Sequence, residues 1–275
     1  MTSFHRFFAA AALGLGLCGN AAATPATADY TDIWWNPTEN GWGINIVQQG
    51  STLFATIFLY GNDNTNRWFI ASNLATLPAN AGQTKFGGVL YQTNGTFFAT
   101  VPYNPAQFGL VEVGTMTVTF DTSNTGTLVY TVGQTTVTKN ITRTTISTND
   151  ITGIFFGGML SKTSNCVNNA NNNLELNLLG TVTGTTTGNT SNYRVDYTLN
   201  NGAAASCNFA GTYSQLGRMG AMSGQWSCTT TGTILNSGTY QITQIDIQKA
   251  GMNGNVVAVD AACTYTGTIG GIRYQ

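Results

Sequence analysis

The stretch WGINIVQQGSTLFATIFLY, residues 42–60, carries the pattern that decides the fold of this chain. Apolar and polar residues alternate over 42–48 and, less strictly, over 53–60, with Gly50 between the two runs. A period of two is typical of β-strands that bury one face, and a short step containing glycine between two such runs indicates a turn. The segment therefore predicts a β-hairpin.

The register of this hairpin assigns its side chains to two faces of the sheet. The face that we expect to form core holds Trp42, Ile44, Ile46, Leu53, Ala55 and Ile57. The opposite face holds Gly43, Asn45, Val47, Phe54, Phe58 and Tyr60.

The same period of two continues along the whole chain. The predicted strands of the first half are 42–48, 53–60, 67–72, 85–92, 96–102, 114–120, 127–132 and 136–143. Those of the second half are 153–159, 173–182, 193–199, 205–215, 220–228, 238–249, 256–264 and 267–274. Turn signals such as Asn94-Gly95, Asn201-Gly202 and Asn253-Gly254 separate strands, and no segment has a sustained helical pattern with caps. We therefore predict an all-β fold of two consecutive antiparallel meander units, barrel-like or sandwich-like, after a cleaved signal peptide.

Tryptophan and cysteine divide the chain into two parts. Four of the five tryptophans lie before residue 70, whereas four of the five cysteines lie after residue 160. A Thr-rich stretch, 144–149, falls between the two parts. We expect a Trp-rich β domain over 29–146 and a disulfide-containing β domain over 150–275, each of about 120 residues, a usual domain size.

The N-terminus has the pattern of a secretory signal peptide. A weakly basic start precedes the apolar run 7–18 and a small-residue run that ends at Ala28. This order predicts cleavage after Ala28 or after Ala23, and hence a secreted or periplasmic protein. The apolar run is too short to cross a bilayer as a helix, so we expect no transmembrane segment in the mature chain. Cys18 leaves a lipoprotein as the alternative, with Leu17 in the place where a small residue is usual.

The composition excludes several kinds of chemistry. The single histidine, His5, lies in the predicted signal peptide. Without histidine, the mature chain has no Ser-His-Asp or Cys-His system and no histidine-ligated metal. Charged residues make up 8% of the chain, the net charge is −1, and no basic run is present, which argues against nucleic acid as a partner. We expect no cofactor and no catalytic activity.

The four late cysteines predict two disulfides, because an even number in an exported protein is typical of disulfide bonding. Suppose that Gly217 and Arg218 are the central residues of a type II′ turn, with glycine supplying the positive φ. Cys207 then lies opposite Cys228 in a non-hydrogen-bonded pair, where Cα atoms approach to about 4.5 Å, within disulfide reach.

This register predicts the pairs Cys207–Cys228 and, by remainder, Cys166–Cys263. A slipped or bulged hairpin would instead join Cys207 to Cys263. A metal site made of all four thiolates is the other alternative, but the sequence has no C-x2-C pair to support it.

The run DIWWNPTENGWG, residues 32–43, resembles the opening of a recurring module in exported proteins of Gram-negative bacteria, W-W-N-P-x-E-x-G-W-G. In that module the motif precedes a Gln-Gly turn, a Phe-x-x-x-Phe-x-Tyr strand and a later Trp, which here are Gln49-Gly50, Phe54 with Phe58 and Tyr60, and Trp68. The later strands of the module resemble segments 113–115 and 139–143. A cysteine-containing β domain often follows the module, and the end of this chain, from 213–220 through 270–273, resembles that domain. The resemblance implies architecture and export, and it implies no particular activity.

Aromatic and polar residues crowd this first motif. Our candidate binding residues are Trp34, Trp35, Glu39, Asn40, Trp42, Tyr60 and Trp68. Rings stack on a sugar or an aromatic ligand while a carboxylate and an amide fix its orientation. Because Trp42 lies on the expected core face, we expect Trp34 or Trp35 to meet the ligand; only one of two adjacent strand residues can face each way. In the alternative interpretation the segment is a turn, required by Gly41 and Gly43, and the tryptophans form core.

Other sites have weaker support. Residues 62–66 alternate oxygen-bearing side chains but lack the glycine and distal Glu of a calcium loop, so we interpret them as a hairpin tip. A glycosidase needs two carboxylates that flank a bond, and the sequence places no such pair. We predict no catalytic residue and no metal ligand.

Three classes of function remain open. The first is an exported, non-catalytic protein that binds a glycan, a small ligand or a protein. The second is a self-associating surface or assembly component, because Thr- and Asn-rich strands with unpaired edges can join other chains. The third comprises a carboxylate-based hydrolase and an outer-membrane β-barrel. Four cysteines and the ending Arg273-Tyr274-Gln275, without a terminal Phe or Trp, disfavour the membrane barrel.

Overall fold

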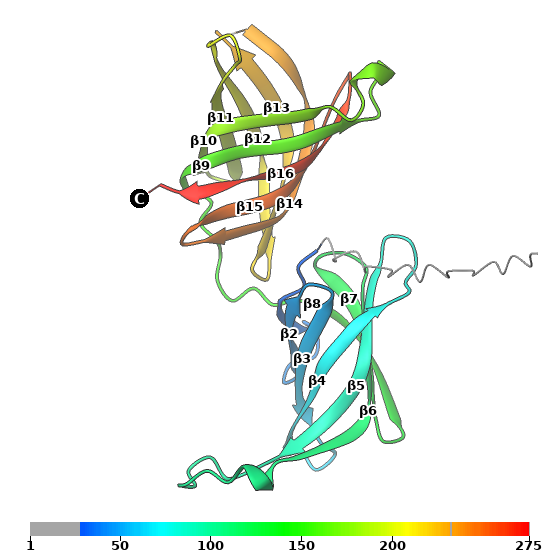
Figure 1. Cartoon of the computed structure of the whole chain (residues 1–275). Helices are drawn as coiled ribbons and strands as arrows, with labels where there is room; N and C mark the ends of the chain where they lie inside the picture. Colours follow the sequence, from blue (N-terminus) through cyan, green and yellow to red (C-terminus); the bar gives the residue numbers. More distant parts are fainter. Residues whose placement is uncertain (1–27, 232, 275) are drawn as a thin grey trace, which may run out of the picture.

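The computed structural model, which describes residues 28–231 and 233–274, is built almost entirely of antiparallel strands (Figure 1). The first eight strands close into one barrel and the next eight into another; we call them barrel 1 and barrel 2. Within each barrel, strands that follow one another in sequence pair with each other, and the first strand pairs with the last. The all-β prediction is confirmed, and barrels replace the open choice between barrel and sandwich. The predicted signal peptide lies outside the described residues except for Ala28.

The strands of barrel 1 are β1 (Asp32–Trp35), β2 (Gly43–Gln49), β3 (Thr52–Tyr60), β4 (Asn66–Leu77), β5 (Thr84–Asn94), β6 (Gly109–Phe120), β7 (Thr125–Val132) and β8 (Thr135–Arg143). Those of barrel 2 are β9 (Gly153–Ser164), β10 (Glu175–Thr187), β11 (Thr190–Thr198), β12 (Ala204–Leu216), β13 (Met219–Thr230), β14 (Thr233–Gln248), β15 (Gly251–Asp260) and β16 (Thr264–Arg273). Two single-turn 3-10 helices, η1 (Pro105–Gln107) and η2 (Asn169–Asn171), lie in the loops after β5 and β9.

The β2–β3 hairpin has the predicted register. Ile44 pairs with Ile57 and Ile46 with Ala55, and all four side chains are buried in the interior of barrel 1. The opposite face of the same hairpin points outward, as the alternation of strand side chains requires. The period of two therefore correctly separated core from surface in this segment.

The β12–β13 hairpin also has the predicted register. Gly217 adopts a φ of +64° at the turn, and Cys207 lies opposite Cys228. The two residues form a disulfide with a Cα–Cα distance of 4.0 Å, and Phe209 lies opposite Trp226 on the same interior face. The second disulfide joins Cys166 to Cys263. Both predicted pairings are thus present in the structure.

The two barrels close by seams of different length. Barrel 1 closes where β1 pairs with β8 through two residue pairs, at Trp34 and Trp35. Barrel 2 closes where β9 pairs with β16 through ten residue pairs, and the Cys166–Cys263 disulfide lies just beyond this seam. The seam of barrel 2 is therefore both longer and covalently reinforced.

Two predictions about strands are wrong. Segment 96–102 is a loop, because Thr100 N–H bonds back to Phe97 O in a turn and Pro102 has no N–H to give to a ladder. Conversely, the short strand β1 was not predicted, since four residues are too few to show a period.

The predicted turn at Asn253-Gly254 is also wrong, because both residues lie inside β15 and the turn is at Lys249-Ala250. A Cβ added to Gly254 would lie 2.9 Å from Ile242 Cγ2. The glycine therefore serves close packing in the interior of barrel 2 rather than a turn.

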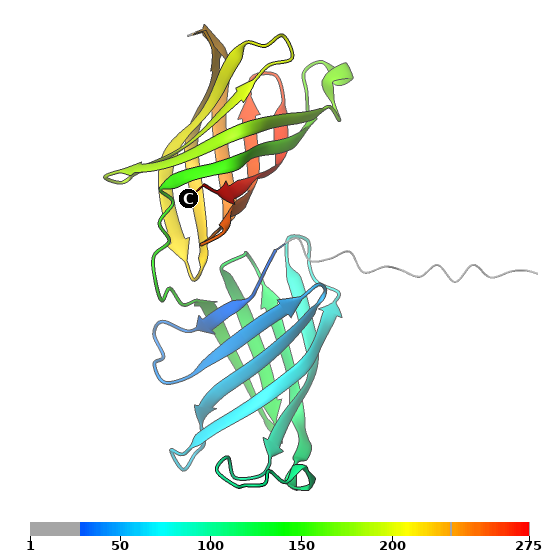
Figure 2. The same ribbon diagram turned by 60° about the vertical axis from the view of Figure 1, so that its left-hand side comes forward.

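The turn of the β12–β13 hairpin contacts the end of barrel 1, and Figures 1 and 2 both show the hairpin pointing there. The backbone N–H of Gly217 donates to Thr145 Oγ1 at 2.9 Å, and that of Arg218 donates to Asp32 Oδ2 at 2.9 Å. The Arg218 guanidinium also forms ion pairs with Asp246 and Asp29. These contacts join the two barrels through one charged cluster.

Candidate functional site

The structure separates the sequence-predicted binding residues into three places. Trp34 is buried in barrel 1 at the end that faces barrel 2, with no exposed surface. Its Nε1–H donates to Tyr30 O at 3.0 Å, and the Arg143 guanidinium lies 4.8 Å from the centre of its ring. The prediction that Trp34 or Trp35 meets a ligand is therefore wrong for Trp34, because the first residue of the pair is the one that points inward. Trp35 is half-buried.

Glu39 and Trp42 lie together at the other end of barrel 1. Trp42 Nε1–H donates to Glu39 Oε2 at 3.1 Å, and Asn36 Nδ2 donates to Glu39 Oε1 at 3.3 Å. Lys139 forms an ion pair with Glu39 and lies 5.6 Å from the centre of the Trp42 ring. Trp42 itself is partly buried and packs against the core of barrel 1.

The electrostatics of this cluster do not suit proton transfer. The hydrogen bond from Lys139 holds the pKa of Glu39 below its ordinary value of 4.5, so the carboxylate is ionised at neutral pH. Burial raises the pKa of Tyr130, and the nearby negative charge of Glu39 raises it further, so this phenol stays protonated. A general acid for hydrolysis needs a raised carboxyl pKa, which is the opposite of what Glu39 has.

The remaining candidates, Tyr60 and Trp68, belong to an exposed surface on the outside of barrel 1. Together with Phe54 and Phe58 they form what we call the aromatic face, on the outer side of β3 and β4. These four rings are between 40% and 56% exposed. Phe58 pairs across the strands with Trp68, which brings two rings side by side.

Glycines of the first motif make room for the rings of the aromatic face. A Cβ added to Gly43 would lie 2.5 Å from Phe58 Cζ, and one added to Gly41 would lie 3.0 Å from Tyr60 Cε2. Each ring therefore rests on bare backbone, in the way that aromatic residues cover glycines in sheets. The close spacing of Gly41, Trp42 and Gly43 thus positions rings that come from the next strand.

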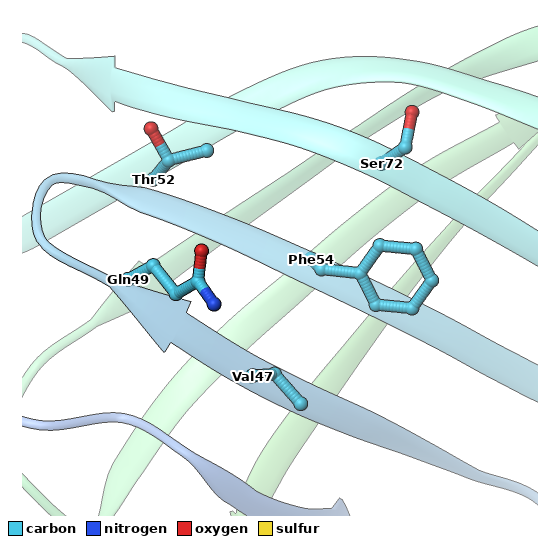
Figure 3. Close-up of a pocket in the computed structure, with 5 residues that line it drawn as sticks. All are labelled: Val47, Gln49, Thr52, Phe54 and Ser72. Atoms are coloured by element: carbon cyan, nitrogen blue, oxygen red, sulfur yellow. The ribbon is translucent and has the colours of Figure 1, made fainter.

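A shallow groove continues the aromatic face along the same strands. Val47, Gln49, Thr52, Phe54 and Ser72 line it, and its volume is about 580 Å³. Figure 3 shows these five side chains on three neighbouring strands, with Gln49 and Thr52 nearer the β2–β3 turn than Phe54. No residue that lines the groove is charged.

The opposite side of barrel 1 differs in chemistry. The outward positions of β6, β7 and β8 are mostly threonine, such as Thr117, Thr127 and Thr138. Exposed rings also occur in the loop between β5 and β6, at Phe97, Phe98, Tyr103 and Phe108, but among the strands of barrel 1 they gather on β3 and β4.

Sequence reasoning named Tyr60 and Trp68 but missed Phe54, Phe58 and Val47 as site residues. The signal was present, because the hairpin register had placed these three on the outward face with Tyr60. Asn40 is exposed in the loop between β1 and β2. Asp63 accepts from Thr65 and Arg67, which confirms that 62–66 is a hairpin tip.

Within the described part of the chain, no group of three or more His, Cys, Asp and Glu side chains is arranged to hold a metal ion. No helix between residues 28 and 274, with residue 232 left aside, is long and apolar enough to cross a membrane. Comparisons of the chain with models of protein families, with curated proteins and with solved structures found no match.

Proposed function

We propose that this chain is an exported, non-catalytic binding protein that holds a neutral glycan on the aromatic face of barrel 1. The observation that carries the proposal is the row of four exposed rings, Phe54, Phe58, Tyr60 and Trp68, beside an uncharged groove. Exposed rings gathered on one surface of a folded protein mark an interaction site.

The spacing of the rings suits an extended ligand. At a rise of about 3.3 Å per residue, Phe54 and Phe58 are about 13 Å apart along β3, and Tyr60 follows about 7 Å further on. Trp68 adds a neighbouring ring from β4 at the level of Phe58. A chain of several sugar rings laid along β3 would therefore meet a ring at more than one position.

The polar groups of the site favour a neutral ligand over a charged one. Gln49, Thr52 and Ser72 offer one amide and two hydroxyls, which donate and accept hydrogen bonds without a net charge. Sugar hydroxyls need such groups, and the C–H faces of the sugar ring stack on aromatic rings. An anionic glycan would instead need arginine or lysine within the groove.

Two further observations support the non-catalytic and exported parts of the proposal. Glu39 is ionised and engaged by Lys139, Trp42 and Asn36 rather than free to act on a substrate. Two disulfides in barrel 2 agree with an oxidising compartment, as the signal-peptide pattern implies.

Isothermal titration of the mature protein with cello-oligosaccharides and chito-oligosaccharides tests the proposal. We expect saturable binding to at least one of these series, and at least a tenfold loss of affinity, about 1.4 kcal/mol, in Trp68→Ala and in Phe58→Ala. Trp68 fluorescence should change on binding, because its half-exposed ring would lose water. Both side chains are half-exposed, so the variants should remain folded.

Tyr274→Ala is the matched control, because Tyr274 is an exposed ring that lies on barrel 2. Its affinity should equal that of the unchanged protein. Equal binding by Trp68→Ala would contradict the proposal, and so would the absence of binding to every oligosaccharide. Dimerisation that Trp68→Ala abolishes, measured by light scattering after size exclusion, would instead favour self-association through the same face.

A further inference from the structure

A second, smaller site lies inside barrel 2. The interior contains a mainly apolar cavity of about 90 Å³ that is lined by residues from all eight strands. Phe209, Trp226 and Tyr265 supply ring walls, Leu178 and Met159 supply alkyl walls, and Ala258 lies at the wall formed by β15. This cavity shares no residue with the aromatic face of barrel 1.

The polar side chains of the lining already contact protein atoms. The Tyr197 hydroxyl lies 3.7 Å from Cys207 Sγ, and Asn236 Nδ2 donates to Asp260 Oδ2 at 3.4 Å. Trp226 Nε1–H donates to Val259 O at 3.3 Å, and the Tyr265 hydroxyl donates to Asp260 Oδ2 at 2.8 Å. Some buried polar side-chain atoms of the described chain have no hydrogen-bond partner. None of these atoms belongs to a residue that lines the cavity. A buried water needs two to four polar partners, so an apolar occupant fits this space better than water does.

The walls of the cavity are held in place. The Cys207–Cys228 disulfide joins β12 to β13, and Cys228 itself lines the cavity. Trp226 contacts the edge of Tyr265, with ring centres 5.7 Å apart, and stacks with Phe209 at 6.3 Å. A cavity whose walls are fixed before binding loses little entropy when a ligand enters, which favours affinity.

The size of the cavity limits the occupant. Apolar cavities of about 150 Å³ enclose a whole benzene ring, whereas this one holds about 90 Å³, so a ring would enter it only in part. Leu176 also lines it and is partly exposed, so the cavity reaches the surface of the barrel. The occupant is therefore one apolar group, which can be the end of a larger molecule.

We propose that the cavity of barrel 2 binds a small uncharged apolar molecule or group, no larger than a single six-membered ring. The site is independent of glycan binding, because it lies in the other barrel and uses interior side chains. The lining is mostly aromatic and alkyl, with Asn236 as its one amide, and such walls would disfavour charged and strongly polar ligands.

Thermal unfolding with and without benzene tests this proposal. We expect benzene, up to its solubility limit, to raise the melting temperature of the unchanged protein in a saturable way. In Ala258→Leu, which adds three carbon atoms at the cavity wall, the affinity should fall at least tenfold. Ala210→Leu is the matched control, since Ala210 lies on the same barrel but faces outward, and it should retain the full effect. Trp68→Ala should retain it too, which separates this site from the aromatic face.

Xenon provides a second test on the unchanged protein, which does not depend on the folding of a variant. A crystal exposed to xenon gas should show a bound atom between Phe209, Trp226 and Leu178. An empty cavity under xenon, no saturable effect of benzene, or an undiminished effect in Ala258→Leu would each overturn the proposal.

Discussion

Barrel 1 and barrel 2 contain the same number of strands in the same meander order, but they place their aromatic side chains differently. In barrel 1, Phe54, Phe58, Tyr60 and Trp68 point outward, and the interior is filled by a packed aromatic and aliphatic core. In barrel 2, Phe209, Trp226 and Tyr265 point inward and surround a cavity. The same sheet architecture thus carries both the proposed outer site, for an extended ligand, and the proposed inner site, for a small one.

The barrels also differ in what stabilises them. Barrel 2 has two disulfides, whereas the described part of barrel 1 has none and instead buries Arg143 at one end. Arg143 pairs with Asp32 at 2.9 Å and donates to Ser123 O at 2.7 Å. This difference predicts that the two barrels respond to different perturbations.

The largest expected effect concerns the Cys166–Cys263 disulfide. Its partners are 97 residues apart, and the entropy of closing such a loop corresponds to about 4 to 5 kcal/mol in the free energy of unfolding. We expect the double variant Cys166→Ala, Cys263→Ala to destabilise barrel 2 by this amount while barrel 1 unfolds as before. Urea unfolding distinguishes the two, because four of the five tryptophans report on barrel 1 by fluorescence whereas circular dichroism reports on both.

Removal of the Cys207–Cys228 disulfide is the matched comparison. Its partners are 21 residues apart, so the same reasoning gives a smaller loss of about 3 kcal/mol. If the urea midpoints seen by fluorescence and by circular dichroism shifted equally in either variant, this would contradict the idea that the two barrels are stabilised separately.

Barrel 1 should be most sensitive to loss of Arg143. Arg143→Ala leaves the buried Asp32 carboxylate without its guanidinium partner, and breaking a buried pair costs about 3 kcal/mol or more. The tryptophan fluorescence transition should move to lower urea, with the transition of barrel 2 nearly unchanged. Arg143→Lys keeps the charge but loses the planar guanidinium group. Its free energy of unfolding should therefore lie between those of the unchanged protein and Arg143→Ala. Stability of Arg143→Ala equal to that of the unchanged protein would show that Asp32 does not depend on this pair.

A smaller effect is expected at the contact between the barrels. Arg218→Ala removes the ion pairs with Asp29 and Asp246 but keeps the backbone donor to Asp32, so we expect a loss of about 1 to 2 kcal/mol. Small-angle X-ray scattering should show a wider distribution of distances, because the barrels become less firmly joined. Arg194→Ala, which removes an exposed ion pair with Asp196 on barrel 2, is the control. It should change neither the stability nor the distribution of distances.

The smallest effect concerns Glu39 at the end of barrel 1. Its pKa is lowered by the hydrogen bond from Lys139, so the pair stabilises the fold above pH 4.5 and is lost as pH falls through the lowered value. Glu39→Gln should therefore lower the melting temperature slightly at neutral pH, and the difference should shrink as the pH falls below 4.5 and through the lowered pKa of Glu39. A difference that persists at low pH would assign the effect to the hydrogen bonds with Trp42 and Asn36 rather than to charge.

Local pattern was enough to predict much of the fold. The period of two within 42–60 gave the register and both faces of the β2–β3 hairpin, because pairing there depends on residues close in sequence. The turn at Gly217 likewise fixed the Cys207–Cys228 pair by counting outward. These predictions succeeded because a hairpin turn determines the register of both strands.

Two features that depend on distant residues were not predicted. The inward orientation of Trp34 follows from its place beside Arg143 at the β1–β8 seam, and nothing near Trp34 in sequence reveals that neighbour. The same is true of the Arg218 contact with Asp29 and Asp32. Of the residues predicted for the candidate binding site, Tyr60 and Trp68 lie on the aromatic face, whereas Trp34 lies in the core.

The short seam of barrel 1 has a consequence for the order of folding. Asp32 and Arg143 are 111 residues apart, so we expect β1 to pair with β8 late in folding. Until then the edge of β1 that faces β8 has no partner. In the folded protein two residue pairs hold this edge, and the Arg218 backbone N–H donates to Asp32 beside them. Such an edge is where sub-global opening begins. Native-state hydrogen exchange should therefore find the amides of β1 to be the least protected of the buried strands of barrel 1, and slow exchange at β1 would show that the seam is stronger than its length implies.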